Sequence, residues 1–155
     1  MANVAETTEI AVDPMRNLLG YHLRQVSAAS MATLAVALSK YGLTPTAASV
    51  LLVIFANPEA RQSAVGRHLS IKRANIAPVI ASLEAQGYLA RTPIDGRSHG
   101  LLCTRSGALL AGRVKKTFEE HEARVFGLLT ESARQKLVGQ FQEIHAEINK
   151  QETFD

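Results

Sequence analysis

Residues 62–104, QSAVGRHLSIKRANIAPVIASLEAQGYLARTPIDGRSHGLLCT, contain the pattern that decides the fold. A short helical repeat over 62–69 is followed by a turn and by a second, longer helical repeat that ends at Gly87. Two strand-like runs, 88–93 and 100–104, then flank a polar loop with an Asp-Gly turn signal. Helix, turn, helix and hairpin in this order predict a winged helix-turn-helix, a mainly α fold with a small antiparallel β-wing.

The second helix of this pair has two different faces. Ser70 is expected to cap its first turn. The buried face is formed by apolar residues at spacings of four and three, Ile76, Ile80 and Leu83. The outward face carries polar and small side chains, Lys72, Arg73, Asn75, Ala77, Pro78 and Ser82. Pro78 removes one backbone hydrogen bond, so we expect a kink in the helix at this residue.

Positive charge is concentrated in the same segment. Residues 61–105 contain seven Arg or Lys residues and two acidic residues, whereas the whole chain of 155 residues has a net charge of only +3. The rest of the chain is therefore net acidic. A local basic charge of this kind is expected of a surface that meets phosphate.

Long helices are expected on both sides of the winged module. On the N-terminal side, residues 1–12 form a tail, and Asp13, which precedes a proline, begins a helix whose apolar stripe continues to Gly42. Thr44, again followed by a proline, begins an apolar helix that stops at Asn57 and should be buried.

On the C-terminal side, Thr104 is expected to cap a helix of about 25 residues, almost 40 Å long. Another helix starts at Thr130 and carries an apolar seam of Leu137, Phe141, Ile144 and Ile148. Helices this long in a small chain expose apolar surface unless another helix covers it, so the terminal helices should pair with those of a second copy. The expected organisation is a tail at 1–12 and one domain at 13–155, with the DNA-binding module at 44–104 and dimerisation helices at 13–42 and 105–150.

The composition argues against a disordered, membrane-spanning, secreted or disulfide-bonded protein. The chain is 46% hydrophobic and 20% charged, as in soluble globular domains. Its most apolar run, 47–56, is too short to span a bilayer, which needs about 20 apolar residues. The acidic N-terminus does not resemble a secretory signal, and the single cysteine, Cys103, excludes an intrachain disulfide. We therefore expect a cytoplasmic protein with no membrane partner.

The outward face of the second helix has the chemistry of a DNA-reading surface. In the major groove Arg or Lys can donate to guanine O6 and N7, and Asn can pair with adenine N6 and N7. Lys72, Arg73 and Asn75 supply these groups, while Ser70 and the first backbone amides suit a phosphate. We predict double-stranded DNA as the partner of this face.

The hairpin loop extends the predicted interface. Arg97 projects from the turn and can enter the minor groove, and Asp95 can hold its guanidinium in a fixed orientation. Arg91 and His99 flank the hairpin and can touch phosphates. The predicted DNA-binding set is Ser70, Lys72, Arg73, Asn75, Pro78, Ser82, Arg91, Asp95, Arg97 and His99.

The run L-x-I-K-R-A-N-I-A-P-V-I-x-x-L-E-x-x-G-Y-L-x-R, followed by D-G-R-S and L-x-C-T-x-x-G, resembles the multiple-antibiotic-resistance regulator (MarR) family of bacterial transcription factors. The resemblance implies a dimer built from the first and last helices, recognition helices in successive major grooves and wing arginines in flanking minor grooves. It also implies a repressor that leaves a pseudo-palindromic operator when a small effector, such as an aromatic acid or an acyl-CoA, binds between the dimer helices and the DNA module.

Other residues have competing interpretations. His22 lies on the apolar stripe of the first helix, where it either lines an effector pocket or is simply packed and hydrogen-bonded. Cys103 is expected to be a small packed apolar residue of the second wing strand. The peroxide-sensing relatives carry their reactive cysteine in the first helix, where this chain has none, so we do not expect that mechanism. His121-Glu122 lacks the second histidine of a zinc-protease helix. We expect neither a metal nor a cofactor.

Two other functions compete with DNA binding. One is a protein-interaction module that uses the winged fold without DNA. The other is a hydrolase that uses Cys103 with His99, but the sequence shows no Gly-rich nucleophile turn and no positioned acid for it. We therefore expect no catalytic residue and no enzyme activity.

Overall fold

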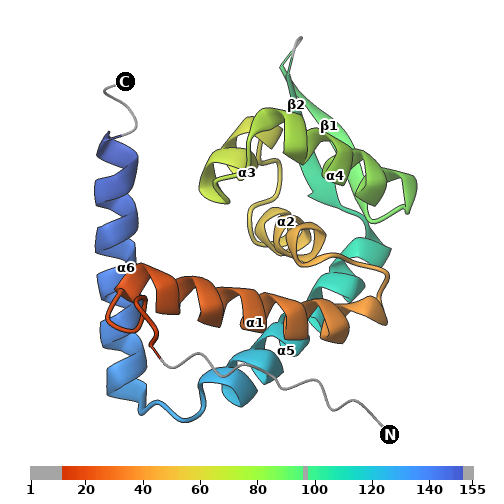
Figure 1. Ribbon diagram of the computed structural model, residues 1–155. Coiled ribbons are helices and arrows are strands. Elements are labelled where there is room, and N and C mark those ends of the chain that lie inside the picture. The colour runs from red at the N-terminus through yellow and green to blue at the C-terminus, as the bar shows by residue number, and fades with distance from the viewer. Residues whose placement is uncertain (1–11, 96–97, 152–155) are drawn as a thin grey trace, which may run out of the picture.

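The computed structural model describes residues 12–95 and 98–151. It confirms a mainly α fold with a two-stranded antiparallel sheet. In Figure 1 the winged module lies on one side, α1 and α5 cross below it, and α6 stands on the other side. The elements in chain order are α1 (Leu19–Ser39), α2 (Pro45–Ala56), α3 (Gln62–His68), α4 (Arg73–Ala85), β1 (Leu89–Asp95), β2 (Ser98–Cys103), α5 (Arg105–Phe126) and α6 (Glu131–Gln151).

Helix α2 lies at the centre of the fold. It packs against α1, α3, α4, α5 and β2, and its side chains Val50, Leu51 and Ile54 are fully buried. Burial of a side chain of this size contributes about 1.5–3 kcal/mol. Helix α2 therefore connects the winged module to α1 and α5. Phe55, near its end, remains 44% exposed.

Two threonine caps predicted from the sequence are confirmed. Thr44 Oγ1 accepts a hydrogen bond from the Ala47 amide (3.1 Å) at the start of α2, and Thr104 Oγ1 accepts one from the Gly107 amide (3.0 Å) at the start of α5. The Thr104 hydroxyl also donates to the Gly87 carbonyl at 2.7 Å. This residue therefore joins the end of the wing to both α5 and the turn after α4.

The first helix begins later than predicted, at Leu19 rather than just after Asp13. Asp13 Oδ1 accepts a hydrogen bond from the Met15 amide at 2.8 Å, and the Met15 carbonyl accepts one from the Leu18 amide at 2.9 Å. A carboxylate bound to the amide two residues further on closes a local turn that competes with the helix. The residues before α1 therefore form separate turns.

The turn between α3 and α4 also differs from its prediction. Ser70 is not the cap of α4: it lies in the left-handed region with a φ of +53°, and Lys72 occupies the N-cap position. The Ser70 amide donates to the Arg67 carbonyl (3.1 Å) and the Ile71 amide to the Gly66 carbonyl (2.8 Å). This pair of bonds is a Schellman motif, which ends α3 before α4 begins.

The wing is longer on its loop side than predicted. β1 and β2 pair from Leu89 opposite Cys103 to Asp95 opposite Ser98, with an irregularity in register just before Asp95. Ser98 and His99, which the sequence analysis places in the loop, pair with Asp95 and Pro93. Backbone hydrogen bonding does not depend on apolar side chains, so the two strands extend into this polar segment. The predicted tail, except for residue 12, and the tip residue Arg97 lie outside the described residues.

Helix α6 packs little against the rest of its own chain. Among the described residues it contains no fully buried side chain, and Phe141, Ile144 and Ile148 are 42%, 46% and 51% exposed. In Figure 1 α6 stands on the side opposite the wing, and it touches the winged module through His145 at the turn after α3. An exposed apolar stripe of this kind is typical of a surface that packs in an assembly. None of the described helices is both long and apolar enough to cross a membrane.

Candidate nucleic-acid interface

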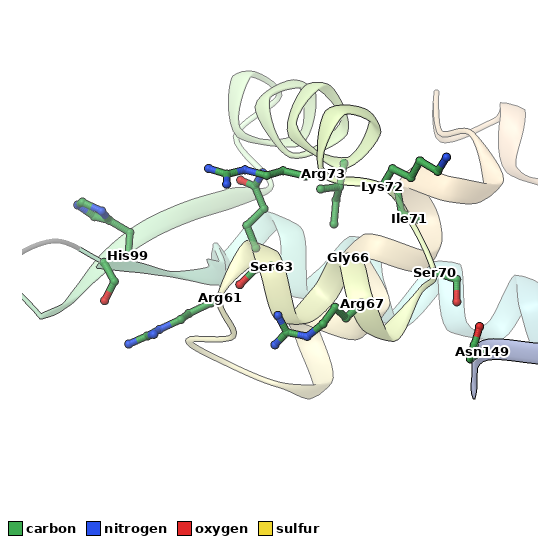
Figure 2. A pocket seen from close by; sticks show the side chains of 13 residues that line it. Arg61, Ser63, Gly66, Arg67, Ser70, Ile71, Lys72, Arg73, His99 and Asn149 are labelled. Atoms are coloured by element: carbon green, nitrogen blue, oxygen red, sulfur yellow. The ribbon is translucent and has the colours of Figure 1, made fainter. Parts of the chain in front are cut away.

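An open groove with a volume of about 900 Å³ runs along the start of α4. Its walls come from α3, from the α3–α4 turn, from the wing and from the end of α6. Figure 2 shows His99 of the wing and Asn149 of α6 at opposite ends of the groove, with Arg61 and Arg67 between them. Segments distant in the sequence thus form one continuous surface.

The groove is strongly basic. Four cationic side chains line it, Arg61, Arg67, Lys72 and Arg73, and its lining contains no Asp or Glu. Within the described part of the chain, no ion pair involves Arg67, Lys72 or Arg73, and all three side chains are exposed. Arg67, Lys72 and Arg73 are therefore available to a polyanion.

The start of α4 adds a second source of positive potential. Its N-cap residue, Lys72, makes no side-chain cap hydrogen bond. The first amides of a helix lack partners within the helix, and the helix dipole adds partial positive charge at this end. An uncapped helix start between Lys72 and Arg73 therefore suits a phosphate oxygen.

The structure brings four of the predicted DNA-binding residues together in the groove: Ser70, Lys72, Arg73 and His99. Three others, Asn75, Pro78 and Ser82, continue along the exposed face of α4 at spacings of three and four. Helix α4 runs through Pro78 without interruption from Arg73 to Ala85. The orientation of the two faces of this helix agrees with the sequence pattern.

The remaining predicted residues lie elsewhere on the wing. Arg91 forms a two-point ion pair with Glu84, from Nε to Oε1 at 2.8 Å and from Nη2 to Oε2 at 3.2 Å. Its side chain is 45% exposed but points to the end of α4 and does not line the groove. Asp95 ends β1, and Arg97 lies outside the described residues.

Two groove residues, Arg61 and Arg67, were not assigned a role from the sequence. The relevant signal is the helical repeat of α3: the spacing that turns Val65 and Leu69 inward places Arg67 on the outer face. Arg61 occupies the N-cap position of α3, a position that its residue type does not favour. Asn149 is also new, because only the folded chain brings the end of α6 to the groove.

A direct contact links α6 to the turn before α4. Ser70 Oγ lies 3.4 Å from His145 Nε2, and one turn later Asn149 lines the groove. Helix α6 also carries the exposed apolar stripe described above. The end of α6 therefore lies against the turn that precedes α4.

The other candidates lie away from the groove. His22 is exposed on α1, and its Nε2 lies 2.7 Å from the Arg16 carbonyl oxygen. Cys103 is half-buried, its Sγ lies 3.9 Å from the Leu51 carbonyl oxygen, and burial raises the pKa of the thiol above its ordinary value. Within residues 12–95 and 98–151, no group of three or more His, Cys, Asp or Glu side chains is placed to hold a metal ion.

Fold and groove together define the class. A basic groove at an uncapped recognition helix, beside a two-stranded wing, is the arrangement of a winged helix-turn-helix protein that binds double-stranded DNA.

Comparisons with known proteins agree with this class. Residues 41–98 match the sequence model of the MarR family. The transcriptional repressor CouR, solved bound to a 23-mer DNA duplex, has 32% sequence identity and a TM-score of 0.81, with 89% of this chain and 99% of CouR covered. CouR bound to p-coumaroyl-CoA gives 30% identity and a TM-score of 0.78, with coverage of 88% and 98%.

Two further relatives come from Mycobacterium tuberculosis and Thauera aromatica. A MarR family protein of Mycobacterium tuberculosis, in complex with salicylic acid, has 28% identity and a TM-score of 0.65 over 81% of this chain and 95% of that one. A protein of Thauera aromatica named as a transcriptional regulatory protein for the hcr operon is 28% identical over 138 residues, with 87% of this chain and 83% of the relative covered.

The chain belongs to the MarR family, and it is a DNA-binding transcriptional regulator. Its relatives in this family are regulators and not enzymes. The resemblance inferred from the sequence motif is confirmed.

Proposed function

We propose that the protein is a dimeric repressor that holds a pseudo-palindromic operator and leaves it when a small aromatic acid or its coenzyme A thioester binds. The observation that carries the proposal is the groove along α4, in which four cations and an open helix start face solvent and no carboxylate lines the wall. It is a cytoplasmic regulator, and we assign it no catalytic residue.

Each part of the interface has a proposed role. Lys72, Arg73 and Asn75 read base edges in the major groove, with Pro78 and Ser82 against its floor. Arg61 and Arg67 add phosphate contacts from α3, and Ser70 another from the turn. On the wing, Arg97 enters the minor groove with Asp95 orienting it, while His99 contacts a phosphate. Arg91 acts through its ion pair with Glu84, which fixes the wing on α4, and it can reach DNA only by breaking that pair.

The dimer is supported by the apolar surface of the terminal helices. On α1, Leu19 is 69% exposed and Val36 is 75% exposed, and α6 adds its stripe of Phe141, Ile144 and Ile148. These side chains lie on two helices at opposite ends of the chain. We propose that residues 13–42 and 105–150 build the dimer and that residues 44–104 form the DNA-binding module, as predicted.

The ligands of related proteins support the proposed class of effector. CouR has been solved with p-coumaroyl-CoA, and the protein from Mycobacterium tuberculosis with salicylic acid. We propose an aromatic acid or its thioester as the effector of this protein. His22 stays a candidate contact on α1: its ring meets Tyr21 edge-on with centroids 5.4 Å apart, a pair that an aromatic ligand can extend.

Titration of a protein–DNA complex tests this proposal. A duplex containing the DNA that flanks the encoding gene is bound in a gel-shift assay, and p-coumaroyl-CoA, p-coumarate and salicylate are added in turn. An effector of this class should weaken DNA binding by about 5- to 150-fold, the usual range of coupling between two sites. Free coenzyme A and aliphatic acids serve as controls. A specific complex that none of the aromatic compounds weakens contradicts the proposed effector class.

A further inference from the structure

Pro78 lies inside the recognition helix α4, where it changes the hydrogen bonding of the backbone. Its ring nitrogen carries no hydrogen, so it cannot donate the helical hydrogen bond to the carbonyl oxygen of Ala74, four residues earlier. Helix α4 is nevertheless continuous from Arg73 to Ala85. The helix therefore contains one carbonyl oxygen, that of Ala74, whose usual amide donor is missing.

No side chain replaces the missing donor. Elsewhere in the chain a carbonyl oxygen receives two hydrogen bonds from the residue four positions later. The Val53 carbonyl accepts from the amide (3.0 Å) and the side chain (2.8 Å) of Asn57, and the Ser82 carbonyl accepts from the amide (3.0 Å) and the side chain (3.2 Å) of Gln86. Pro78 offers Ala74 neither bond, and no side chain within the described part of the chain donates to Ala74.

The missing hydrogen bond lies on the outward side of the helix. Ile76, Ile80 and Leu83 form the buried face of α4. At 100° per residue, Ala74 and Pro78 lie within about 30° of the line directly opposite that face. Both residues are exposed. A helical hydrogen bond lies on the same side of the helix as the two residues that it joins. The Ala74 carbonyl oxygen is therefore on the face of α4 that is turned away from the core.

The outward side of α4 allows a partner to approach the backbone closely. Ala74 and Pro78 have no long side chain that would hold another surface away. They also lie near the start of the helix, the part of a recognition helix that meets base edges in the major groove. A carbonyl oxygen has two lone pairs, so it can accept a hydrogen bond from a group beside the helix. The Ala74 carbonyl is thus placed to meet a base.

This carbonyl adds an acceptor to a surface that is rich in donors. Lys72 and Arg73 can only donate, whereas Asn75 can donate and accept. Glu84 is the only carboxylate of α4, and Arg91 holds it in an ion pair at 2.8 Å. In the major groove, cytosine N4 and adenine N6 are amino donors, whereas guanine O6 and N7 and thymine O4 are acceptors. An acceptor on this face of α4 therefore favours cytosine or adenine.

We propose that the carbonyl oxygen of Ala74, left open by Pro78, accepts a hydrogen bond from the exocyclic amino group of a cytosine or an adenine in the major groove. This contact selects the base at one position of each half-site. Guanine or thymine at that position would place an acceptor against an acceptor. Pro78 is then a specificity-determining residue that acts through the backbone of Ala74. The inference rests on the role of α4 given under the proposed function.

Selection of bound duplexes from a random-sequence library, followed by sequencing, tests the inference with the unsubstituted protein and with Pro78→Ala. Alanine restores the amide, which then occupies the Ala74 carbonyl. The preference for adenine or cytosine at one position of each half-site should fall about three- to tenfold, as expected for one hydrogen bond. Thermal unfolding should show a Pro78→Ala protein at least as stable as the unsubstituted one. Identical base preferences in the two proteins would overturn the inference.

Duplexes that lack a single amino group test the contact from the DNA side. At the selected position, the base is replaced by an analogue without the exocyclic amino group, such as purine for adenine. This change should weaken binding of the unsubstituted protein about three- to tenfold and leave binding of Pro78→Ala unchanged. The same analogue outside the half-sites is the control. Equal losses with both proteins would contradict the contact.

Pro78→Val separates the carbonyl from the proline ring. Valine keeps an apolar side chain of comparable size but restores the amide, so the same loss of base preference is expected. A valine variant that keeps the preference would show that the side chain contacts the base, and would overturn the role of Ala74. Absence of any specific complex with the unsubstituted protein would contradict the proposed function itself. A specific complex in which no base preference depends on Pro78 would contradict only this inference.

Discussion

Replacement of Arg67 and Arg73 with alanine in one variant is expected to lower the affinity for specific DNA by at least about 2 kcal/mol, or about 30-fold. Both side chains line the same groove, and neither is neutralised by a carboxylate within the described residues. Each lost phosphate contact also removes about 0.9 from the slope of log K against log salt concentration. Fluorescence anisotropy of a labelled duplex at several salt concentrations measures both effects.

The matched control is Lys115→Ala combined with Lys116→Ala, which removes the same charge from α5. Lys115 and Lys116 are exposed and pair with Glu119 and Glu120 at 3.5 and 3.7 Å, outside the groove. Long-range electrostatics alone would weaken binding equally in both double variants. Equal losses would therefore show that the groove makes no direct contact with DNA.

Gly107→Ala is expected to destabilise the fold by about 3 kcal/mol, the upper end for overpacking of a close contact. A Cβ on Gly107 would overlap the carbonyl oxygen of Tyr88, where the start of α5 lies against the start of the wing. Neither backbone can move alone, because the Thr104 amide also donates to that carbonyl at 3.0 Å. Thermal unfolding should show a melting temperature lower by about 6–12 °C.

Gly112→Ala on the same helix is the control for this prediction. A Cβ at Gly112 meets no atom within 4 Å, and alanine is favoured over glycine inside a helix by about 0.5–1 kcal/mol. The two substitutions are chemically identical but should change stability in opposite directions. A Gly107→Ala protein as stable as the unsubstituted one would mean that the wing is not packed against α5 in this way.

Local signals predicted most of the fold. Thr44 and Thr104 cap their helices as expected. Gly42 was expected to cap the first helix, but the C-cap is Lys40, and Gly42 lies in the following turn with a φ of +67°. These signals involve atoms within a few residues of one another, so a single sequence contains them. Asp13 and Ser70 were misassigned because each has a second local option, a turn for Asp13 and the end of α3 for Ser70. Sequence alone does not show which option the tertiary structure favours.

The sequence predicted the basic chemistry of the DNA interface, but not every residue that forms it. Lys72 and Arg73 lie in the groove as the basic run suggests, and the periodicity of α4 orients its two faces. The pairing of Arg91 with Glu84 depends on how the wing folds back on α4, at a separation of seven residues that crosses a turn. Asn149 reaches the groove only through the path of α6. Such long-range contacts have no signature in one sequence.

We expect two copies of the chain to hold one duplex through their basic grooves. The most direct test is analytical ultracentrifugation of the protein with a duplex from the region that flanks its gene, together with the salt dependence of binding. We expect two protomers on each duplex and, with Arg61 and Arg67 of each protomer on phosphates, a slope of log K against log salt of about −3.6. A single protomer on the duplex, or an affinity that does not change with salt, would contradict it.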